Sequence, residues 1–381
     1  MNTCRKWYGI VLTAALVLTL IGCGTTQQGT GSGTTQIEYP TLSGTITVVE
    51  KYGHTVTDIA VADMYAAGYA LGDILTVQFG NGYAFDAPLV LAYDVERGQY
   101  LLRTEYGDGF VAACINYGDL AKEANAGVGD TINLSMKSKA GYLAKFELRQ
   151  LQRTDQRADY ASDAVFANFR EIKNGNIAGG ILYRGSHPTK TEWPRAPYAS
   201  ALMENAGIAT VINMSDTGEE LTMYLDTANP DASSYYKKLS DNNAVTCLSM
   251  GMTYTDSAFV EKIVAALRFM LSHPAPYYVH CNEGKDRTGF IAILLEALMG
   301  AKQEEITADY MLSYVNYYGL EPGTEKYKLI ADDNAVVMLK EIAGTDNLAR
   351  TNTTNAAKAY LLKNGMEASE IEALQKLLSG K

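Results

Sequence analysis

Cysteine and histidine are scarce in this chain of 381 residues, which has five cysteines and four histidines. Cys4 and Cys23 lie in the N-terminal segment, so only Cys114, Cys247 and Cys281 remain for the rest of the chain. So few thiols do not supply the disulfide framework of a small secreted scaffold. The histidines lack the ligand spacing of a zinc or iron site, so we expect no metal and no cofactor.

Basic residues are also in deficit, with 32 Lys and Arg against 43 Asp and Glu and a net charge of -11. This balance argues against a general attraction to nucleic acid or to an anionic membrane surface. Any anionic substrate therefore needs positive charge gathered locally. The 47% hydrophobic content is ordinary for a chain that folds around a core.

The apolar run near the N-terminus, residues 9–22, is too short to span a bilayer comfortably and follows Arg5 and Lys6. We interpret residues 1–22 as a secretion signal. The residues Leu20-Ile21-Gly22-Cys23 resemble the lipobox of bacterial lipoproteins, which implies lipidation of Cys23 and an extracytoplasmic, membrane-anchored protein. Residues 23–36 then form a flexible polar tether. An ordinary signal peptide or an uncleaved anchor is the alternative.

Short alternating segments broken by glycine turns fill residues 37–150 and predict a small all-β domain, a barrel or a sandwich. Asn81-Gly82 suits a tight hairpin turn, and Ile132, Leu134 and Met136 alternate as in a strand. Cys114 is expected in its core. The segment 111–134 faintly resembles the β-barrel domain of adenosyl-hydroxide adenosyltransferases, and no activity is carried over from that likeness.

From about residue 160 to 381, strands alternate with helical stretches, which predicts an α/β domain with a mostly parallel central sheet flanked by helices. The segment DSAFVEKIVAALRFMLSHP, residues 256–274, predicts a helix that starts near Asp256 and Ser257 and stops at Pro274. The segment 289–300 is apolar nearly all round and predicts a buried helix. The four expected strands have the sequences GILYRG, ATVINM, AVTCLSM and PYYVH.

The segment VHCNEGKDRTG, residues 279–289, follows the last of these strands and precedes the buried helix. We expect the strand to end at His280, a loop over residues 281–287, and the helix to begin at about Thr288. Several backbone N–H groups and the positive end of a helix dipole then point into one concavity, which is a ready anion site. Gly284 lets the backbone curl closely around the anion.

The side chains of this loop have the chemistry of nucleophilic attack on phosphorus. Arg287 can hold two phosphate oxygens with its planar fork. The positive surroundings favour the thiolate form of Cys281, which is the nucleophilic form of a thiol. The Thr288 hydroxyl could donate to the sulfur and help expel it from the intermediate.

The run HCNEGKDRTG resembles the signature of the protein tyrosine phosphatase superfamily, in which five residues separate Cys from an Arg followed by Ser or Thr. The blocks NFREI, GILYRGSHP and YASALMENAGIATVINMSDTGEE are similar to those of the bacterial members with Lys-Asp before this Arg. The likeness runs from about Asp163 to the C-terminus. It implies a tyrosine phosphatase-like fold with Cys281 as nucleophile and Arg287 as phosphate clamp. The residues expected to surround the bound substrate are Asn282, Glu283, Gly284, Lys285 and Thr288.

The general acid has two candidates. Many relatives carry it in a Trp-Pro-Asp loop, but the one Trp-Pro of this chain is followed by Arg195. In the subfamily with Lys-Asp in the loop, the loop aspartate is thought to protonate the leaving oxygen, which here is Asp286. Asp256 is the alternative acid, and its other interpretation is a helix N-cap.

Several further residues are given supporting roles. His280 is expected to orient the loop through hydrogen bonds, and the resemblance places Arg184 behind the loop as a brace. The tyrosines of residues 309–319 either pack in the core or line the rim of the site. Cys247 is expected as a buried cysteine on a strand, and protection of Cys281 by disulfide formation is the other interpretation.

These observations together predict a cysteine-dependent phosphatase that acts on phosphotyrosine. Lys285 adds a second cation, and relatives with this lysine tend to accept phosphoinositides as well, so an inositol phosphate or phosphoinositide phosphatase is the first alternative. A surface module that binds phosphate groups without turnover is the second. The expected partners are a phosphorylated protein or an inositol phosphate, and the membrane through Cys23, with no nucleic acid.

Overall fold

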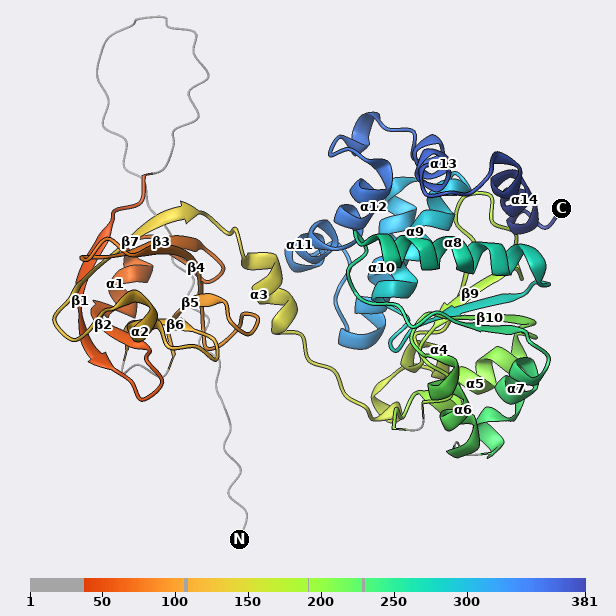
Figure 1. Ribbon diagram of the computed structural model, residues 1–381, viewed down its shortest axis with the longest axis horizontal. Helices are drawn as coiled ribbons and strands as arrows, with labels where there is room; N and C mark the ends of the chain where they lie inside the picture. The colour runs from red at the N-terminus through yellow and green to blue at the C-terminus, as the bar shows by residue number, and fades with distance from the viewer. Residues whose placement is uncertain (1–37, 106–108, 191, 228–229) are drawn as a thin grey trace, which may run out of the picture. The chain divides into compact units, whose positions relative to one another are not determined.

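The computed structural model describes residues 38–105, 109–190, 192–227 and 230–381 (Figure 1). The expected signal peptide (1–22), the tether (23–36) and the lipidated Cys23 lie outside these residues and stay predictions. Within the described part, no helix is both long and apolar enough to cross a bilayer.

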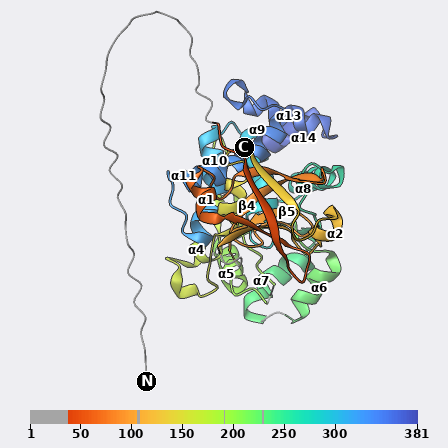
Figure 2. The ribbon, with the colours of Figure 1, turned by 90° about the vertical axis from the view of Figure 1, so that its left-hand side faces the viewer.

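Seven strands near the N-terminus close into a barrel in the order β1-β2-β6-β5-β4-β3-β7 (Figures 1 and 2). The pair β4 and β5 is parallel, and the other neighbours are antiparallel. The predicted barrel is therefore confirmed, although short helices accompany its strands and the region is not all-β. Its elements are β1 (Leu42–Val49), β2 (Thr55–Ala60), α1 (Val61–Ala66), β3 (Ile74–Phe79), β4 (Ala84–Val90), β5 (Tyr100–Arg103), β6 (Phe110–Ile115), α2 (Leu120–Ala124) and β7 (Thr131–Ser138).

The barrel interior is filled by the apolar side of each strand, because successive side chains of a strand point to opposite faces. Ile132 and Leu134 of β7 are fully buried in this core. The turn between β3 and β4 uses Gly82 at a φ of 90°, and Asn81 Oδ1 accepts a hydrogen bond from the Tyr83 amide at 2.9 Å. Cys114 is buried as expected, and burial raises the pKa of its thiol to about 12.

The C-terminal part is an α/β structure around a five-stranded sheet in the order β11-β10-β12-β9-β8. All neighbouring pairs are parallel except β8 with β9, and β8 was not among the predicted strands. The strands are β8 (Arg170–Ile172), β9 (Leu182–Gly185), β10 (Thr210–Asn213), β11 (Val245–Cys247) and β12 (Tyr277–His280). The helices before β12 are α3 (Leu143–Arg149), α4 (Asp163–Phe166), α5 (Ala196–Asn205), α6 (Gly218–Thr227), α7 (Pro230–Asp241) and α8 (Ser257–Ser272), with a 3-10 turn η1 at Arg157–Asp159. Those after it are α9 (Asp286–Leu298), α10 (Gln303–Tyr318), α11 (Glu325–Asp333), α12 (Ala335–Ala343), α13 (Thr353–Lys363) and α14 (Ala368–Leu378), with a 3-10 turn η2 at Leu348–Arg350.

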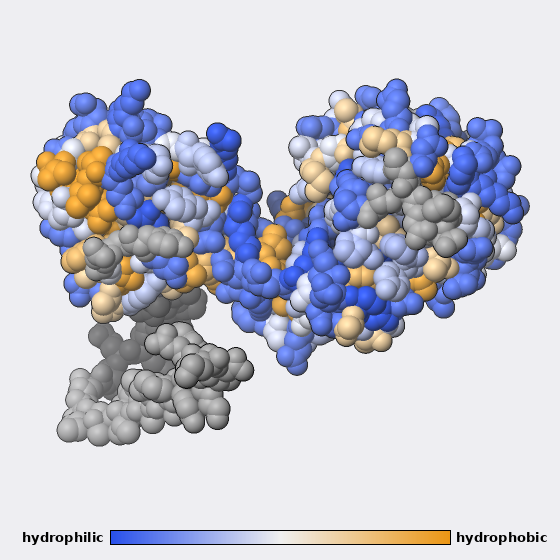
Figure 3. Space-filling view, turned by 90° about the horizontal axis from the view of Figure 1, so that it is seen from below, coloured by the Kyte–Doolittle hydropathy of each residue, from blue (hydrophilic) through white to orange (hydrophobic). Residues whose placement is uncertain are grey.

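Both faces of the sheet are covered, which explains why its strands are apolar without alternation. Tyr277 and Val279 of β12 point into the core formed with α8 to α10 and α12 to α14. Tyr278 points to the opposite face and packs with residues of α5, α6 and α7. Figure 1 shows these two helical layers above and below the strands. In Figure 3, hydrophilic residues cover most of the visible surface, as expected when the apolar side chains fill these cores.

The connection from β12 to α9 places the sequence motif at the carboxyl edge of the sheet. The strand ends at His280 as predicted, but α9 begins at Asp286, two residues before the predicted start at Thr288. Asp286 and Arg287 therefore belong to the first turn of the helix. All α9 residues from Thr288 to Leu298 are buried, in agreement with their apolar sequence.

Candidate functional site

The loop at residues 281–285 is held tightly between β12 and α9. Gly284 has a φ of 67°, and a Cβ atom there would lie 2.1 Å from the carbonyl oxygen of Gly185. No other residue fits this position without moving the backbone. Cys281, which follows β12 directly, is 3% exposed.

The carbonyls of four consecutive loop residues are all bonded to groups outside the loop. Asn282 O accepts from the His187 amide at 3.0 Å, and Glu283 O from the Tyr317 hydroxyl at 2.6 Å. The carbonyl oxygens of the next two residues accept from Arg184 Nη2, at 2.9 Å from Gly284 and 3.1 Å from Lys285. A trans peptide directs its N–H opposite to its C=O. The N–H groups of residues 283–286 therefore turn away from these partners, toward the inside of the loop, as an anion cradle requires.

The polar side chains inside the loop are held without using all of their hydrogen bonds. Arg287 Nη1 donates to Met250 O at 3.0 Å and to Met214 O at 3.3 Å. Its buried Nε has no partner among the described residues, and neither do Thr288 Oγ1 and Asn282 Oδ1. The expected hydrogen bond from Thr288 to the Cys281 sulfur is thus not formed in this structure. Unpartnered buried polar atoms are costly, so their grouping here indicates a site for a polar ligand.

Behind the loop, the predicted brace Arg184 is completely buried and shares a carboxylate with a second arginine. Arg184 Nη1 lies 2.5 Å from Asp309 Oδ2, and Arg170 Nε lies 2.7 Å from Asp309 Oδ1. Burial opposes the ionisation of Asp309, but the two arginines outweigh it and lower its pKa. The sequence analysis did not identify Asp309 or Arg170. Asp309 did not stand out in the sequence, because α10 also carries Glu304 and Glu305.

Asn168 adds to this support from the block NFREI. Its Nδ2 donates to Glu283 O at 3.1 Å and to Ser313 Oγ at 3.1 Å, and its side-chain oxygen accepts from Arg170 Nη1 at 2.8 Å. Asn168 is fully buried and has a φ of 51°, a left-handed conformation that asparagine tolerates better than most residues. It therefore ties β8, α10 and the loop together.

Three of the four tyrosines of α10 lie behind the loop, whereas Tyr318 is half-buried and its hydroxyl lies 3.5 Å from Lys285 Nζ. Tyr310, Tyr314 and Tyr317 are each at most 2% exposed. The Tyr310 hydroxyl donates to Asp286 Oδ1 at 3.2 Å, and the Tyr314 ring centroid lies 4.9 Å from Lys285 Nζ. The core interpretation of these residues therefore holds, with the addition that their hydroxyls and rings contact the loop.

Lys285 does not stand free as a second cation beside the phosphate. Its Nζ lies 3.3 Å from Glu283 Oε2 and 3.9 Å from Asp286 Oδ2, and the residue is 8% exposed. Burial opposes its charge, but Asp286 and other neighbours hold the pKa of Lys285 above its ordinary value. The charge of Lys285 is thus already balanced by carboxylates of its own loop.

Glu283 is also held by an arginine from outside the matched phosphatase blocks. Arg153 Nη1 lies 2.7 Å from Glu283 Oε1, and its guanidinium lies 5.0 Å from the Tyr317 ring centroid. Burial raises the pKa of Glu283, but Lys285 and Arg153 outweigh it, so the net shift is downward. Glu283 therefore stays ionised and engaged with cations. Sequence reasoning missed Arg153, because nothing in the junction sequence indicates its distant partner.

The two acid candidates lie in different surroundings. The Asp286 side chain is 32% exposed and shares a pocket of about 160 Å³ with Arg287, Met252 and Tyr254. Asp256 is exposed, occupies the N-cap position of α8 without a side-chain cap hydrogen bond, and does not line this pocket. Asp256 therefore occupies the N-cap position but does not cap the helix with its side chain. Because Asp286 shares the pocket with Arg287, its position suits the general acid better than that of Asp256.

A buried polar network supports the loop from the β10 side. His187 Nδ1 accepts from the amides of Thr189 and Lys190 at 3.2 Å, so its Nε2 proton faces Asp216 Oδ2 at 2.6 Å. Burial raises the pKa of Asp216, but hydrogen bonds from His187 and Asn213 outweigh it and lower the pKa to about 2. His187 and Asp216 were not predicted as a pair, because 29 residues separate them.

His280 lies next to this network, as expected for a residue that orients the loop. Its Nε2 lies 3.1 Å from the Tyr236 hydroxyl and its Nδ1 lies 3.3 Å from Cys281 O. Burial, and then the neighbouring His187, hold the pKa of His280 well below its ordinary value, so the ring is neutral. Cys247 is half-buried and does not form a disulfide, and burial raises its pKa to about 12.

Arg195, the residue after the one Trp-Pro of the chain, has a structural role. Its guanidinium is 1% exposed, pairs with Asp155, and donates to Thr154 O at 2.7 Å and to the Tyr160 hydroxyl at 2.8 Å. These partners belong to the segment between β7 and β8. Arg195 therefore anchors that segment.

Chemically, the site combines a buried thiol, inward N–H groups and an arginine without a carboxylate partner in the described part of the chain. These are the components of nucleophilic displacement on an anionic centre. Over the same residues, no group of three or more His, Cys, Asp and Glu side chains gathers as a metal site would require.

Comparison with known proteins places this loop in a known family. Residues 165–380 match the tyrosine phosphatase family. A provisionally named tyrosine-protein phosphatase of Cupriavidus necator is 56% identical over 34 residues, which are 9% of this chain and 12% of that protein. The chain thus spans about an eighth of the curated relative it matches.

Three solved structures are similar over parts of their length. The core catalytic domain of the PP-IP phosphatase SIW14 from S. cerevisiae, solved with citrate, is 17% identical over 48% of this chain and 99% of its own, with a TM-score of 0.25. P. aeruginosa TpbA, solved with phosphotyrosine, is 14% identical over 53% and 88%, with a TM-score of 0.24. An uncharacterised conserved protein from Thermotoga maritima is 24% identical over 25% and 36%, with a TM-score of 0.24.

Proposed function

This chain belongs to the tyrosine phosphatase family, and from that premise we propose that it hydrolyses phosphotyrosine through a phosphocysteine intermediate on Cys281. The observation that carries the proposal is the arrangement of the four loop carbonyls from Asn282 to Lys285, which are tied back so that the N–H groups face inward. Such a cradle, next to a thiol and an arginine, suits a phosphoryl group.

In the first step, the Cys281 thiolate attacks phosphorus in line with the leaving oxygen. The S–P bond forms while the P–O bond to the tyrosine ring breaks, and Asp286 gives its proton to the leaving oxygen. Arg287 and the inward N–H groups stabilise the charge on the equatorial oxygens. In the second step, water attacks phosphorus, Asp286 takes back a proton, and the S–P bond breaks to release phosphate and the thiolate.

Phosphotyrosine is favoured over inositol phosphates because of how charge is distributed around the loop. A polyphosphorylated ring needs several uncommitted cations near its phosphates. Lys285 is neutralised by Glu283 and Asp286, and Arg153 is paired with Glu283. Arg287 is left as the loop cation with no carboxylate partner in the described part of the chain, which suits a single phosphate.

A substrate panel tests this choice. Phosphotyrosine peptides, phosphoserine peptides, a phosphoinositide and inositol hexakisphosphate are each offered to the purified protein, and phosphate release is measured. We expect the highest kcat/KM with phosphotyrosine peptides. Preference for inositol hexakisphosphate over every peptide would sink the phosphotyrosine assignment, although not the enzyme class.

The variant Cys281→Ser tests the covalent mechanism. Turnover is expected to fall on the order of 10⁴-fold or more, as for removal of other catalytic nucleophiles, while phosphotyrosine peptide is still bound. Mass spectrometry of the acid-quenched wild-type protein should detect one added phosphate on Cys281. A variant with unchanged phosphate release would show that Cys281 is not the nucleophile.

The acid is identified by comparing two isosteric variants on two leaving groups. Asp286→Asn should lower kcat by about 10²-fold or more on phenyl phosphate and by far less on p-nitrophenyl phosphate, whose leaving oxygen needs no proton. Asp256→Asn is the matched control and should behave as wild type on both. The reverse pattern would assign the acid to Asp256.

We further propose that the protein is an extracytoplasmic lipoprotein anchored at Cys23. Support comes from the sequence alone, namely the basic start, the short apolar run and the residues Leu20 to Cys23. In a bacterial host, the wild type should fractionate with membranes and incorporate labelled palmitate. Cys23→Ser should abolish the label, and labelling that persists in this variant would contradict the proposal.

A further inference from the structure

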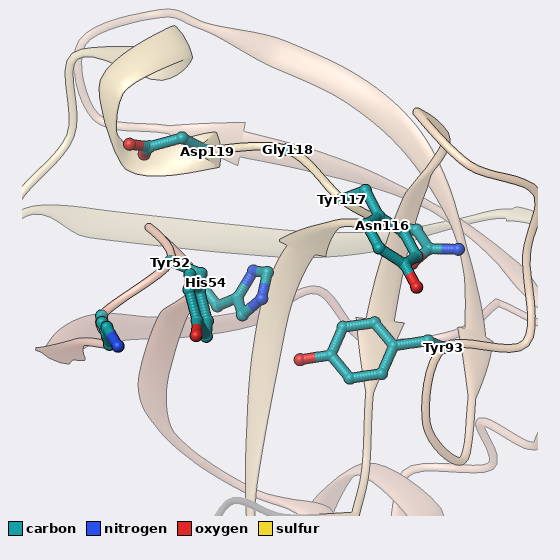
Figure 4. Close-up of a pocket in the computed structure, with 8 residues that line it drawn as sticks. Tyr52, His54, Tyr93, Asn116, Tyr117, Gly118 and Asp119 are labelled. Atoms are coloured by element: carbon teal, nitrogen blue, oxygen red, sulfur yellow. The ribbon is translucent and has the colours of Figure 1, made fainter.

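The barrel has a second pocket, unrelated to the phosphate loop. It has a volume of about 820 Å³, compared with about 160 Å³ for the pocket beside Asp286 and Arg287. Its walls come from three connections of the barrel: residues 51–54 between β1 and β2, Tyr93 between β4 and β5, and residues 116–119 between β6 and α2 (Figure 4). The family match begins at residue 165, so it does not include this pocket.

The pocket presents aromatic rings to solvent. Tyr117 is 80% exposed and Tyr52 is 65% exposed, although both are large apolar side chains. Deeper in the wall, the rings of Tyr93 and His54 approach with centroids 5.6 Å apart, and Figure 4 shows them pointing toward one another. Aromatic faces gathered around a concavity are typical of a ligand site.

Tyr117 holds its exposed position at a conformational cost. Its φ is 58°, in the left-handed region that is unfavourable for a bulky side chain. The Arg97 guanidinium lies 4.7 Å from the Tyr117 ring centroid and covers it. The structure thus keeps this ring at the edge of the pocket despite strain and exposure.

Polar atoms with spare hydrogen-bonding capacity line the same pocket. His54 is 5% exposed, and its Nδ1 has no partner among the described residues. Asn116 donates its Nδ2 to Val95 O at 2.9 Å, and Asp119 Oδ1 accepts from the Lys122 amide at 3.0 Å. These bonds leave one side-chain oxygen on Asn116 and one on Asp119 for a ligand, since no described group donates to either.

The charge of the pocket differs from that of the phosphate loop. Lys51 is the single cation and Asp119 the single anion among the eight lining residues. Burial lowers the pKa of His54, so its ring is neutral and can donate or accept a hydrogen bond. Among these eight residues a charged ligand finds no surplus of the opposite charge, and the Arg97 guanidinium at the edge is engaged with the Tyr117 ring.

We propose that this pocket binds a neutral carbohydrate. A sugar ring has an apolar C–H face that packs on tyrosine rings, and neighbouring hydroxyls that both donate and accept hydrogen bonds. Tyr52 and Tyr117 supply the flat faces. The imidazole of His54, the amide of Asn116 and the carboxylate of Asp119 supply polar partners for the hydroxyls. The proposal rests on barrel residues alone and does not depend on the proposed phosphatase substrate.

The test is calorimetric titration of the full-length protein with cellotriose, maltotriose and chitotriose. Trigalacturonate serves as the anionic comparison, and adenosine as a flat nucleoside that could also stack on the rings. We expect at least one neutral trisaccharide to bind, and Tyr117→Ala and Tyr52→Ala each to weaken that binding by about tenfold, the effect of one lost aromatic contact. Trigalacturonate and adenosine should bind at least ten times more weakly than that trisaccharide.

Two matched variants keep the interpretation sharp. Tyr65→Ala removes another exposed tyrosine of the barrel, on α1 and outside the pocket, and should leave sugar binding unchanged. Cys281→Ser should also bind sugar as wild type, which separates this test from that of the phosphatase mechanism. No binding of any neutral sugar at 10 mM, equal losses in Tyr65→Ala, or binding of adenosine alone would each overturn the proposal.

Discussion

The two sides of the phosphate loop treat positive charge in opposite ways. Behind the loop, Arg170 and Arg184 share the carboxylate of Asp309, and all three are nearly or fully buried. On the inner side, Arg287 contacts backbone carbonyls but no carboxylate within the described residues, and its buried Nε has no partner. Removal of one partner from a buried ion pair is strongly destabilising, whereas an uncommitted cation is available for a ligand. The rear side therefore holds the loop in shape, and the proposed chemistry takes place on the inner side.

Among the variants that compare the two sides, the largest effect is expected from Arg287→Lys on the inner side. A lysine keeps the charge but loses the planar fork, so kcat/KM should fall by about 10²–10³-fold, with little change in stability. Arg268→Lys is the control, because Arg268 is exposed on α8 and pairs with half-buried Glu370 at 2.7 Å. Steady-state kinetics and thermal unfolding measure both. If Arg287→Lys lowered the stability as much as a rear-side variant does, the two sides of the loop would not have different roles.

Asp309→Asn on the rear side should act mainly on stability. It leaves two buried arginines without their counter-charge, which costs about 3–5 kcal/mol in the free energy of unfolding. Urea unfolding measures this cost. Asp163→Asn is the control, since Asp163 pairs with Arg157 at the surface and should change stability by about 1 kcal/mol at most. The kcat of Asp309→Asn is measured at low temperature, where the variant is still folded. A loss of kcat as large as that of Arg287→Lys would show that Asp309 contributes to catalysis and not only to stability.

Arg153→Gln should have a smaller effect on turnover. Glu283 and Asp286 then share Lys285 as their one cation, and the excess negative charge opposes an incoming phosphate. We expect kcat/KM to fall by about two- to fivefold, with the difference shrinking at high salt. Arg157→Gln removes an arginine of the same segment that does not contact the loop. An equal loss in this control would point to damage of the segment and not to the charge of Arg153.

The smallest effect concerns Glu296, a fully buried residue of α9 near the rear cluster. Burial, followed by the neighbouring Asp309, holds its pKa well above the ordinary value of 4.5. A raised carboxyl pKa contributes stability that is full below pH 4.5 and is lost as pH rises toward neutrality. Glu296→Gln cannot ionise. Its Tm should therefore exceed that of the wild type by about 2–4 °C at pH 7.5, which corresponds to roughly 1 kcal/mol in the free energy of unfolding. A gain of the same size at pH 4.5 would show that ionisation is not the cause.

Much of the loop was predictable because its signals are local. The apolar residues before His280, the Cys-to-Arg spacing and the apolar segment after Thr288 lie within one short stretch. The start of α9 was misplaced by two residues, because Asp286 and Arg287 look like loop residues in sequence. As the first turn of a helix, they are instead favoured by the N-terminal dipole for Asp286 and by the carbonyls of Met214 and Met250 for Arg287.

The supporting contacts could not be predicted because they join distant segments. Asn168 and Glu283 are 115 residues apart, and Arg184 and Asp309 are 125 apart. A single sequence contains no sign of such pairs beyond an isolated polar residue in an apolar stretch. The rings around the Lys285 ammonium group were not predictable for the same reason, since distant α10 supplies them.

The contacts of Arg195 determine where this domain can be joined to another protein without loss of its fold. The family match begins at residue 165, yet the buried Arg195 guanidinium depends on Thr154, Asp155 and Tyr160. A recombination event or an engineered fusion that joined a foreign domain at residue 165 would remove these partners. The Arg195 guanidinium would then be buried without its hydrogen bonds and its counter-charge. The unit that folds together therefore includes about a dozen residues upstream of residue 165, where the family match begins. Fusions that keep these residues should be recovered folded.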